Sequence, residues 1–214
     1  MREDNKALLL VDLQNDFFPG NALGVPNAEA IFPLANQMQS YFDLVVASKD
    51  WHPPNHLSFA RNHPGYHDFE IIQLKGLPQV LWPAHCVENT QGAEFHPKLE
   101  TTHIKKIIYK GTDPEIDSYS AFFDNAHQKK TELDAYLRHQ GVNILYILGL
   151  ATDYCVQYTA LDALQLGFKT FVILDGCFGI NQHIGDIDKA IQNMKDAGAN
   201  IIESQKILTE TFAK

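Results

Sequence analysis

The sequence predicts an α/β fold: a doubly wound, mostly parallel six-stranded sheet with helices on both faces, in three α/β/α layers. Short apolar runs of strand length recur along the 214 residues. Nearly continuous apolar runs are typical of parallel strands that are covered on both faces. Amphipathic helical patterns alternate with these runs, and such alternation indicates βαβ units.

Six apolar runs are the expected strands, at residues 7–11, 44–48, 106–109, 143–148, 170–174 and 200–203. Four segments carry apolar residues at helical spacing: a segment that starts at Asn27, and residues 130–139, 153–166 and 184–197. Asn27 is a suitable N-cap, and Pro33 is expected to kink the first helix or delay its start. Glycines follow the other three helices and are expected to end them.

Residues 51–102 break this alternation, because they hold many histidines and prolines and little periodicity. A loop-rich excursion of this length inside a compact domain is usually functional. No repeat or composition shift marks a linker. We therefore expect a single domain over residues 1–214 with a loop-rich, metal-binding excursion at about 51–102. Whether residues 58–75 form a mobile lid is left open.

The charge balance limits the partners. Lys and Arg total 17 and Asp and Glu total 26, which gives a net charge of −9. Such a chain is a poor match for nucleic acid or for an anionic membrane surface. The charged start is unlike a signal peptide, and no run approaches the ~20 apolar residues that cross a bilayer. We expect a cytoplasmic protein with reduced thiols. The sequence does not decide whether the protein forms a homo-oligomer.

Polar residues stand where four expected strands end. Ligands of open α/β sheets bind outside the carboxyl ends of the strands. The first strand is followed by Asp12, the second by Asp50 and the third by Lys110, and Cys155 follows the fourth. The sequence therefore predicts two acids, a lysine and a thiol at one edge of the sheet.

Cys155 is the candidate nucleophile. It lies in the first turn of an expected helix, where the dipole and the unpaired N–H groups favour a thiolate and can hold an oxyanion. Cys86 and Cys177 are rival thiols, but neither starts an obvious helix. Asp12 is a candidate base, provided that burial raises its pKa. Lys110 would oppose that rise and favour both anions.

A second group of residues suits a metal. Asp50 and His52 are two residues apart, so an extended chain points both side chains the same way. His56 can return after the intervening prolines, and His85 follows later. A carboxylate with several imidazoles binds divalent transition metals. The same excursion holds two rival candidates, His63 and His67.

Several motifs resemble those of one family. They are residues 11–17 (VDLQNDF), 50–52 (DWH), 82–87 (WPAHCV), 95–97 (FHP), 109–111 (YKG) and 149–156 (GLATDYCV). Together they resemble the nicotinamidases, within the isochorismatase-like cysteine hydrolases. The matches run in order from about residue 7 to 180 and cover most of the chain.

The resemblance implies a role for each of these residues. The implied catalytic triad is Asp12, Lys110 and Cys155. The implied metal ligands are Asp50, His52, His56 and His85, with waters completing the shell. A cis peptide at Leu150–Ala151 would aim the amides of Ala151 and Cys155 at the oxyanion. Three aromatic side chains would surround a pyridine ring: Phe17, Trp82 and Tyr119.

The implied activity is hydrolysis of nicotinamide to nicotinate and ammonia through a cysteine thioester, in NAD salvage. One divalent transition metal ion, with zinc ahead of iron or manganese, would bind the ring nitrogen. Activity on pyrazinamide is implied by the family alone. Two alternatives remain: an amide hydrolase of the same fold with an N-carbamoyl or ureido substrate, and a non-catalytic metal-binding or redox module.

Overall fold

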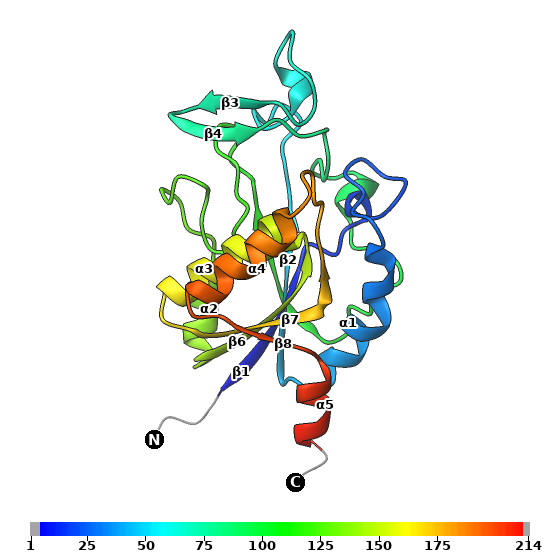
Figure 1. Cartoon of the computed structure of the whole chain (residues 1–214), viewed down its shortest axis with the longest axis vertical. Helices are drawn as coiled ribbons and strands as arrows, with labels where there is room; N and C mark the ends of the chain where they lie inside the picture. Colours follow the sequence, from blue (N-terminus) through cyan, green and yellow to red (C-terminus); the bar gives the residue numbers. More distant parts are fainter. Residues whose placement is uncertain (1–4, 212–214) are drawn as a thin grey trace.

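A parallel sheet forms the centre of the computed structural model, which describes residues 5–211. Within those residues the sheet has six strands in the order β5-β2-β1-β6-β7-β8, and every pairing is parallel (Figure 1). The strands are β1 (Lys6–Val11), β2 (Leu44–Asp50), β5 (Ile104–Lys110), β6 (Ile144–Leu150), β7 (Lys169–Phe178) and β8 (Asn200–Ile202).

Alternate residues of the strands face opposite sides of the sheet. Leu8 and Leu10 of β1 join one hydrophobic core, whereas Leu9 and Val11 join the other. All four side chains are fully buried. The two-residue period of a strand therefore explains why its sequence is a continuous apolar run: both faces are covered.

Helices cover both faces, as the three-layer prediction requires (Figure 1). On one face lie α1 (Ile31–Gln39) and α5 (Gln205–Thr211). On the other lie α2 (Leu133–His139), α3 (Gln157–Gln165) and α4 (Asp186–Asp196). The predicted fold class is confirmed. None of the helices in residues 5–211 combines the length and the apolar character that a bilayer span requires.

The predicted cap of the first helix is wrong. Asn27 has a left-handed φ of 60° and makes no capping hydrogen bond through its side chain. A 3₁₀ turn follows at Ala28–Ala30, and α1 begins only at Ile31. Pro33 then stands in the first helical turn, where its missing N–H costs no hydrogen bond. The expected delay of the helix start by Pro33 agrees with this arrangement.

Other boundaries also differ from the predicted ones. The helix expected from residue 153 begins as a π-helical turn, Thr152–Val156, before α3. The strand expected to end at residue 174 continues to Phe178. A hairpin of β3 (Ile71–Leu74) and β4 (Leu77–Val80) was missed, because its strands are short and half-exposed. Its turn residues Lys75 and Gly76 both have positive φ, which is the backbone of a tight hairpin turn.

The parallel topology brings the functional residues together. β5, β2, β1 and β6 are neighbours and all end at the same edge of the sheet. Lys110 is in register with Asp50, and Asp12 directly follows β1. The β3–β4 hairpin and the loops around it lie beyond this edge (Figure 1), and the last residues of the 51–102 excursion return along α1 to the start of β5.

Candidate active site

Lys110 lies at the centre of a buried group of charged side chains. Its Nζ is 2.6 Å from Asp50 Oδ1, 2.9 Å from Asp12 Oδ2 and 3.3 Å from Cys155 Sγ. Lys110 also donates to the backbone oxygen of Ser118, 3.0 Å away. All four charged or thiol side chains are buried. The structure thus brings together the acid, second acid, lysine and thiol expected at one sheet edge.

Two opposing effects determine the charges of these side chains: burial favours the neutral forms, and pairing with an opposite charge favours the charged forms. Burial acts to lower the pKa of Lys110, but Asp12 and Asp50 outweigh it and hold the pKa well above the usual value. Burial acts to raise the pKa of Asp50, but Lys110 and His52 outweigh it and hold the pKa well below. Lys110 and Asp50 therefore form a charged pair at neutral pH.

Asp12 has the environment of a base. Burial is the largest influence and raises its pKa, although Lys110 acts in the opposite direction. The hydroxyl of Ser48 donates to Asp12 Oδ1 at 2.6 Å and fixes the carboxylate. A carboxylate with a raised pKa accepts a proton more readily near neutral pH. Ser48 was missed in the sequence, where a serine within a strand carries no distinctive signal.

At Cys155 the buried environment opposes the thiolate that a helix start favours. Burial is the largest influence and raises the pKa of this thiol well above its usual value, and Lys110 only partly opposes it. The Cys155 side chain also shares a hydrogen bond with Asp12. Loss of solvation outweighs the attraction of Lys110 because the residue is almost completely buried. Cys155 is therefore a neutral thiol that is held beside a base.

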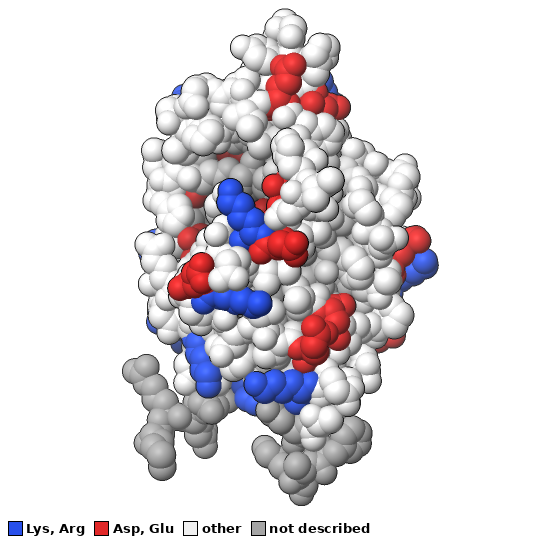
Figure 2. Space-filling view, viewed as in Figure 1, with Lys and Arg blue, Asp and Glu red and all other residues white. Residues whose placement is uncertain are grey.

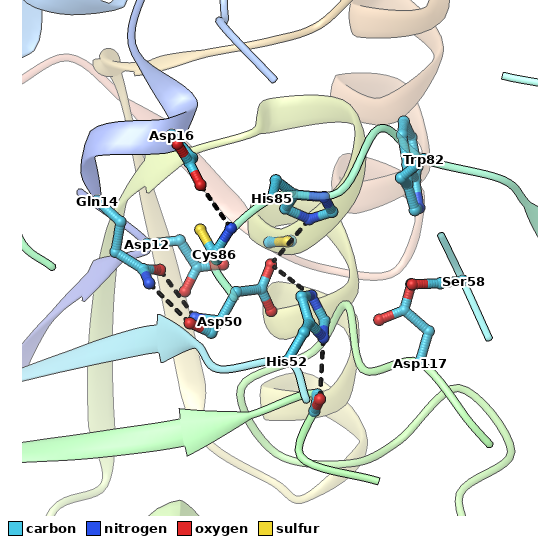
Figure 3. A network of polar contacts seen from close by, with 12 residues as sticks. Asp12, Gln14, Asp16, Asp50, His52, Ser58, Trp82, His85, Cys86 and Asp117 are labelled. Carbon is cyan, nitrogen blue, oxygen red and sulfur yellow. Dashed lines mark hydrogen bonds and ion pairs between the residues drawn. The ribbon is translucent and has the colours of Figure 1, made fainter. Parts of the chain in front are cut away.

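Asp50, His52 and His85 are arranged as metal ligands (Figure 3). Asp50 Oδ2 lies 3.6 Å from His52 Nε2 and 3.8 Å from His85 Nε2. Ligand atoms about 2.1 Å from a tetrahedral ion are separated by roughly 3.4 Å, close to this spacing. The three side chains are buried. The donor set fits a divalent transition metal.

The ring protons of both histidines support this fit. His52 Nδ1 lies 2.9 Å from the backbone oxygen of Gly111, and His85 Nδ1 lies 2.8 Å from that of Pro83. A carbonyl oxygen only accepts hydrogen bonds, so each Nδ1 carries the proton. In the neutral ring, Nε2 of each histidine then carries no proton and faces Asp50, which is the usual orientation of metal-binding histidines.

His56 stands in a different group from the one predicted. One ring nitrogen of His56 lies within 4.8 Å of a nitrogen of His52 and of an oxygen of Asp117. That group does not include Asp50 or His85. Burial, the largest influence, lowers the pKa of His56 to about 4, so its ring is neutral. Asp117 was missed, because it lies in an irregular loop without periodicity.

The alternative candidate ligands and thiols lie outside these groups. His63 Nε2 contacts the backbone oxygen of Leu57 at 2.7 Å, and His67 is exposed. Neither joins a group of possible metal ligands within residues 5–211. Cys86 is fully buried but does not line the cavity that Cys155 faces, and Cys177 is half-buried elsewhere.

A cavity joins the thiol to the metal-binding side chains. The aromatic residues named from the sequence all line it, and Trp82 Nε1 donates to the hydroxyl of Tyr119 at 3.3 Å. Sequence reasoning missed four of its lining residues: Leu23, Asp117, Tyr154 and Ile180. The full lining is Phe17, Leu23, Asp50, Trp82, His85, Asp117, Tyr119, Ala151, Tyr154, Cys155 and Ile180.

An open groove adjoins this cavity, and Tyr154 lines both. The groove runs between the β3–β4 hairpin and the helices α3 and α4, where the surface in Figure 2 is hollowed. Basic and acidic side chains are interspersed on this face, so the net charge of −9 is not gathered there into one patch (Figure 2). Tyr154 therefore lies between the open groove and the cavity that Cys155 lines.

Two glycines permit the close packing of the site. A Cβ on Gly111 would lie 2.3 Å from His52 Cε1, and one on Gly149 would lie 2.2 Å from the backbone oxygen of Val11. Both residues have positive φ, +65° and +138°. The peptide bond Leu150–Ala151 just after Gly149 is cis, as expected. Only glycine fits at these two positions.

The chain matches known proteins over nearly its whole length. The isochorismatase domain model matches residues 6–206. The nicotinamidase of Escherichia coli is 50% identical over 92% of this chain and 93% of its own. A nicotinamidase/pyrazinamidase structure from Acinetobacter baumanii is 47% identical, with a TM-score of 0.93 over 97% of this chain and 100% of its own. The pyrazinamidase of Pyrococcus horikoshii in complex with zinc is 39% identical, with a TM-score of 0.76 over 93% and 99% of the two chains. The chain therefore belongs to the isochorismatase family.

Proposed function

We propose that this protein hydrolyses nicotinamide to nicotinate and ammonia through a thioester at Cys155. The observation that carries the proposal is one cavity that is lined both by the thiol and by candidate metal ligands. Cys155 lies there beside Asp12 and Lys110, and Asp50 and His85 line the same cavity. The 50% identity to a nicotinamidase supports the choice of substrate.

The cavity suits a small aromatic amide. Phe17, Trp82 and Tyr119 offer ring faces and edges to a flat pyridine ring, which favours offset or edge contacts. Asp50, His52 and His85 would hold one divalent transition ion. Zinc is our choice, because a relative forms a complex with zinc, and iron and manganese also suit such ligands. When bound, the ion supplies a Lewis acid for the ring nitrogen of the substrate.

The protein residues carry out the acyl transfer. Asp12 accepts the proton of the Cys155 thiol, and the sulfur attacks the amide carbon. The amides of Ala151 and Cys155 stabilise the oxyanion. Asp12 returns the proton to the nitrogen as the C–N bond breaks, which releases ammonia and leaves a thioester. Asp12 then deprotonates a water that attacks the thioester, which frees nicotinate and restores the thiol. Lys110 stays protonated and stabilises the anions.

The test is ammonia release from nicotinamide by the purified protein, with and without a chelator. We expect turnover in the wild type, loss of at least a thousandfold in Cys155→Ala, and little change in the matched control Cys177→Ala. We also expect the chelator to abolish turnover and added zinc to restore it. Full activity of Cys155→Ala would remove the thiol from the mechanism.

A further inference from the structure

His56 has a buried nitrogen without a partner. The side chain is fully buried, and its Nε2 makes no hydrogen bond to another group. Buried polar atoms in folded proteins are almost always paired, with protein groups or with ordered water. A ring nitrogen of His56 lies within 4.8 Å of His52 and of Asp117. An unpaired atom there points to a group that binds it.

The other nitrogen of His56 fixes the position of the ring proton. The backbone N–H of Ser58 donates to His56 Nδ1 at 3.1 Å, and the Ser58 hydroxyl lies 2.7 Å from the same atom. A nitrogen that accepts from an amide carries no proton. The proton of His56 is therefore on Nε2, which is a donor with no lone pair for a metal.

This state is opposite to that of the neighbouring histidines. His52 and His85 give their Nδ1 protons to backbone carbonyls and leave Nε2 free for an ion. If His56 bound an ion through Nε2, its Nδ1 would become a donor, and the buried amide of Ser58 would lose its acceptor. The hydrogen bonds therefore fit His52 and His85 as metal ligands through Nε2, and His56 as a hydrogen-bond donor through Nε2.

Asp117 supplies the matching acceptor. Its side chain is 3% exposed and lines the cavity. Its carboxylate accepts from Gln79 Nε2 at 3.2 Å and from the backbone N–H of Ser118 at 2.8 Å, so lone pairs remain. A ring nitrogen of His56 and a carboxylate oxygen of Asp117 lie within 4.8 Å without a direct hydrogen bond. Two hydrogen bonds through one water span roughly 4.5 Å.

We propose that His56 and Asp117 hold a water in the coordination shell of the ion, and that neither residue is itself a ligand. His56 Nε2–H donates to this water, and the Asp117 carboxylate accepts from it. The pair thereby stabilises the ion from outside the Asp50–His52–His85 set. The role of His56 changes from the predicted ligand to a positioning residue. The inference rests on the metal site of the proposed function.

The first test reads the ring protons in the full-length wild-type protein. Long-range ¹H–¹⁵N NMR distinguishes the two neutral forms of each histidine before and after zinc is added. We expect His56 to keep its proton on Nε2 in both states, whereas His52 and His85 keep theirs on Nδ1. A zinc-loaded His56 with its proton on Nδ1 would overturn the proposal.

The second test measures zinc affinity by competition with a chromophoric chelator. We expect His56→Gln and Asp117→Asn each to weaken zinc by 10–100-fold, as is typical of groups that orient a metal shell. His52→Gln should weaken it by at least a thousandfold, and the exposed control His67→Gln should not change it. If His56→Gln weakened zinc as much as His52→Gln does, His56 would be a ligand. If neither His56→Gln nor Asp117→Asn changed the zinc affinity, the proposed role of His56 and Asp117 would be wrong.

The two proposals fail in different ways. If the wild type binds no zinc, iron or manganese, both the metal site and the water-holding pair are wrong. If it binds zinc with the expected proton positions but releases no ammonia from nicotinamide, the proposed substrate is wrong and the pair stands. If turnover is normal but His56 binds zinc directly, only the pair is wrong.

Discussion

Lys110 Nζ lies 2.6 Å from Asp50 Oδ1, so a single lysine joins the thiol group to the metal-binding carboxylate. The other oxygen of Asp50 faces His52 and His85. Each oxygen of one carboxylate thus serves a different half of the site. The register of β2 against β5 fixes this contact, because it pairs Asp50 with Lys110.

Removal of Lys110 should destabilise the fold as well as abolish turnover. Lys110→Ala would leave Asp12 and Asp50 buried without their counter-ion, which typically costs about 3–5 kcal/mol. Urea denaturation measures this change. The control is Lys75→Ala, because the exposed pair of Lys75 with Glu115 should contribute less than about 1 kcal/mol. Equal stability of the two variants would contradict the buried charge pair.

A methyl group at Gly111 should displace a metal ligand. Gly111→Ala places a Cβ 2.3 Å from His52 Cε1, so we expect a loss of zinc affinity of at least a hundredfold, measured by chelator competition. Gly76→Ala is the matched control, since Gly76 has a φ of +84° but open space around its Cβ position. It should carry only the left-handed backbone cost of about 1–2 kcal/mol and keep its zinc affinity.

Alkylation of Cys155 should accelerate with pH in metal-free protein. Because burial raises the pKa of Cys155 well above its usual value, the reactive thiolate is a minor form at neutral pH. Its fraction, and the rate of iodoacetamide modification, should rise about tenfold per pH unit from pH 7 to 9. Mass spectrometry locates the modified residue. A rate that is already level at pH 7 would show a resting thiolate.

Loss of the Tyr119 hydroxyl should weaken the packing of the aromatic residues that line the cavity. Tyr119→Phe removes the acceptor of Trp82 Nε1 at 3.3 Å, whereas Gln79 Nε2 keeps Asp117 and the backbone oxygen of Val80 as acceptors. An unpaired buried donor costs about 1–3 kcal/mol, so we expect a lower Tm and a raised KM for nicotinamide with a smaller change in kcat. Tyr109→Phe, at a residue that is 47% exposed, should alter neither quantity.

The sequence by itself determined the fold class and the residues at the sheet edge. Strands that are buried on both faces must be apolar throughout, so they can be read directly, and parallel strands must end at one edge. Asp12, Asp50, Lys110 and Cys155 could therefore be grouped without coordinates. His85 was a candidate ligand from its residue type, and the resemblance to the family added the three aromatic residues of the cavity, Phe17, Trp82 and Tyr119.

Only the tertiary structure decided which protons and which loop residues complete the site. Asp117 and Ser48 join it through chain paths that no local pattern specifies. The neutral thiol of Cys155 follows from desolvation, which depends on everything packed around it. The proton on His56 Nε2 depends on one backbone amide of Ser58. Residue types and strand order are local properties of the chain, whereas solvation and hydrogen-bond partners exist only once the chain has folded.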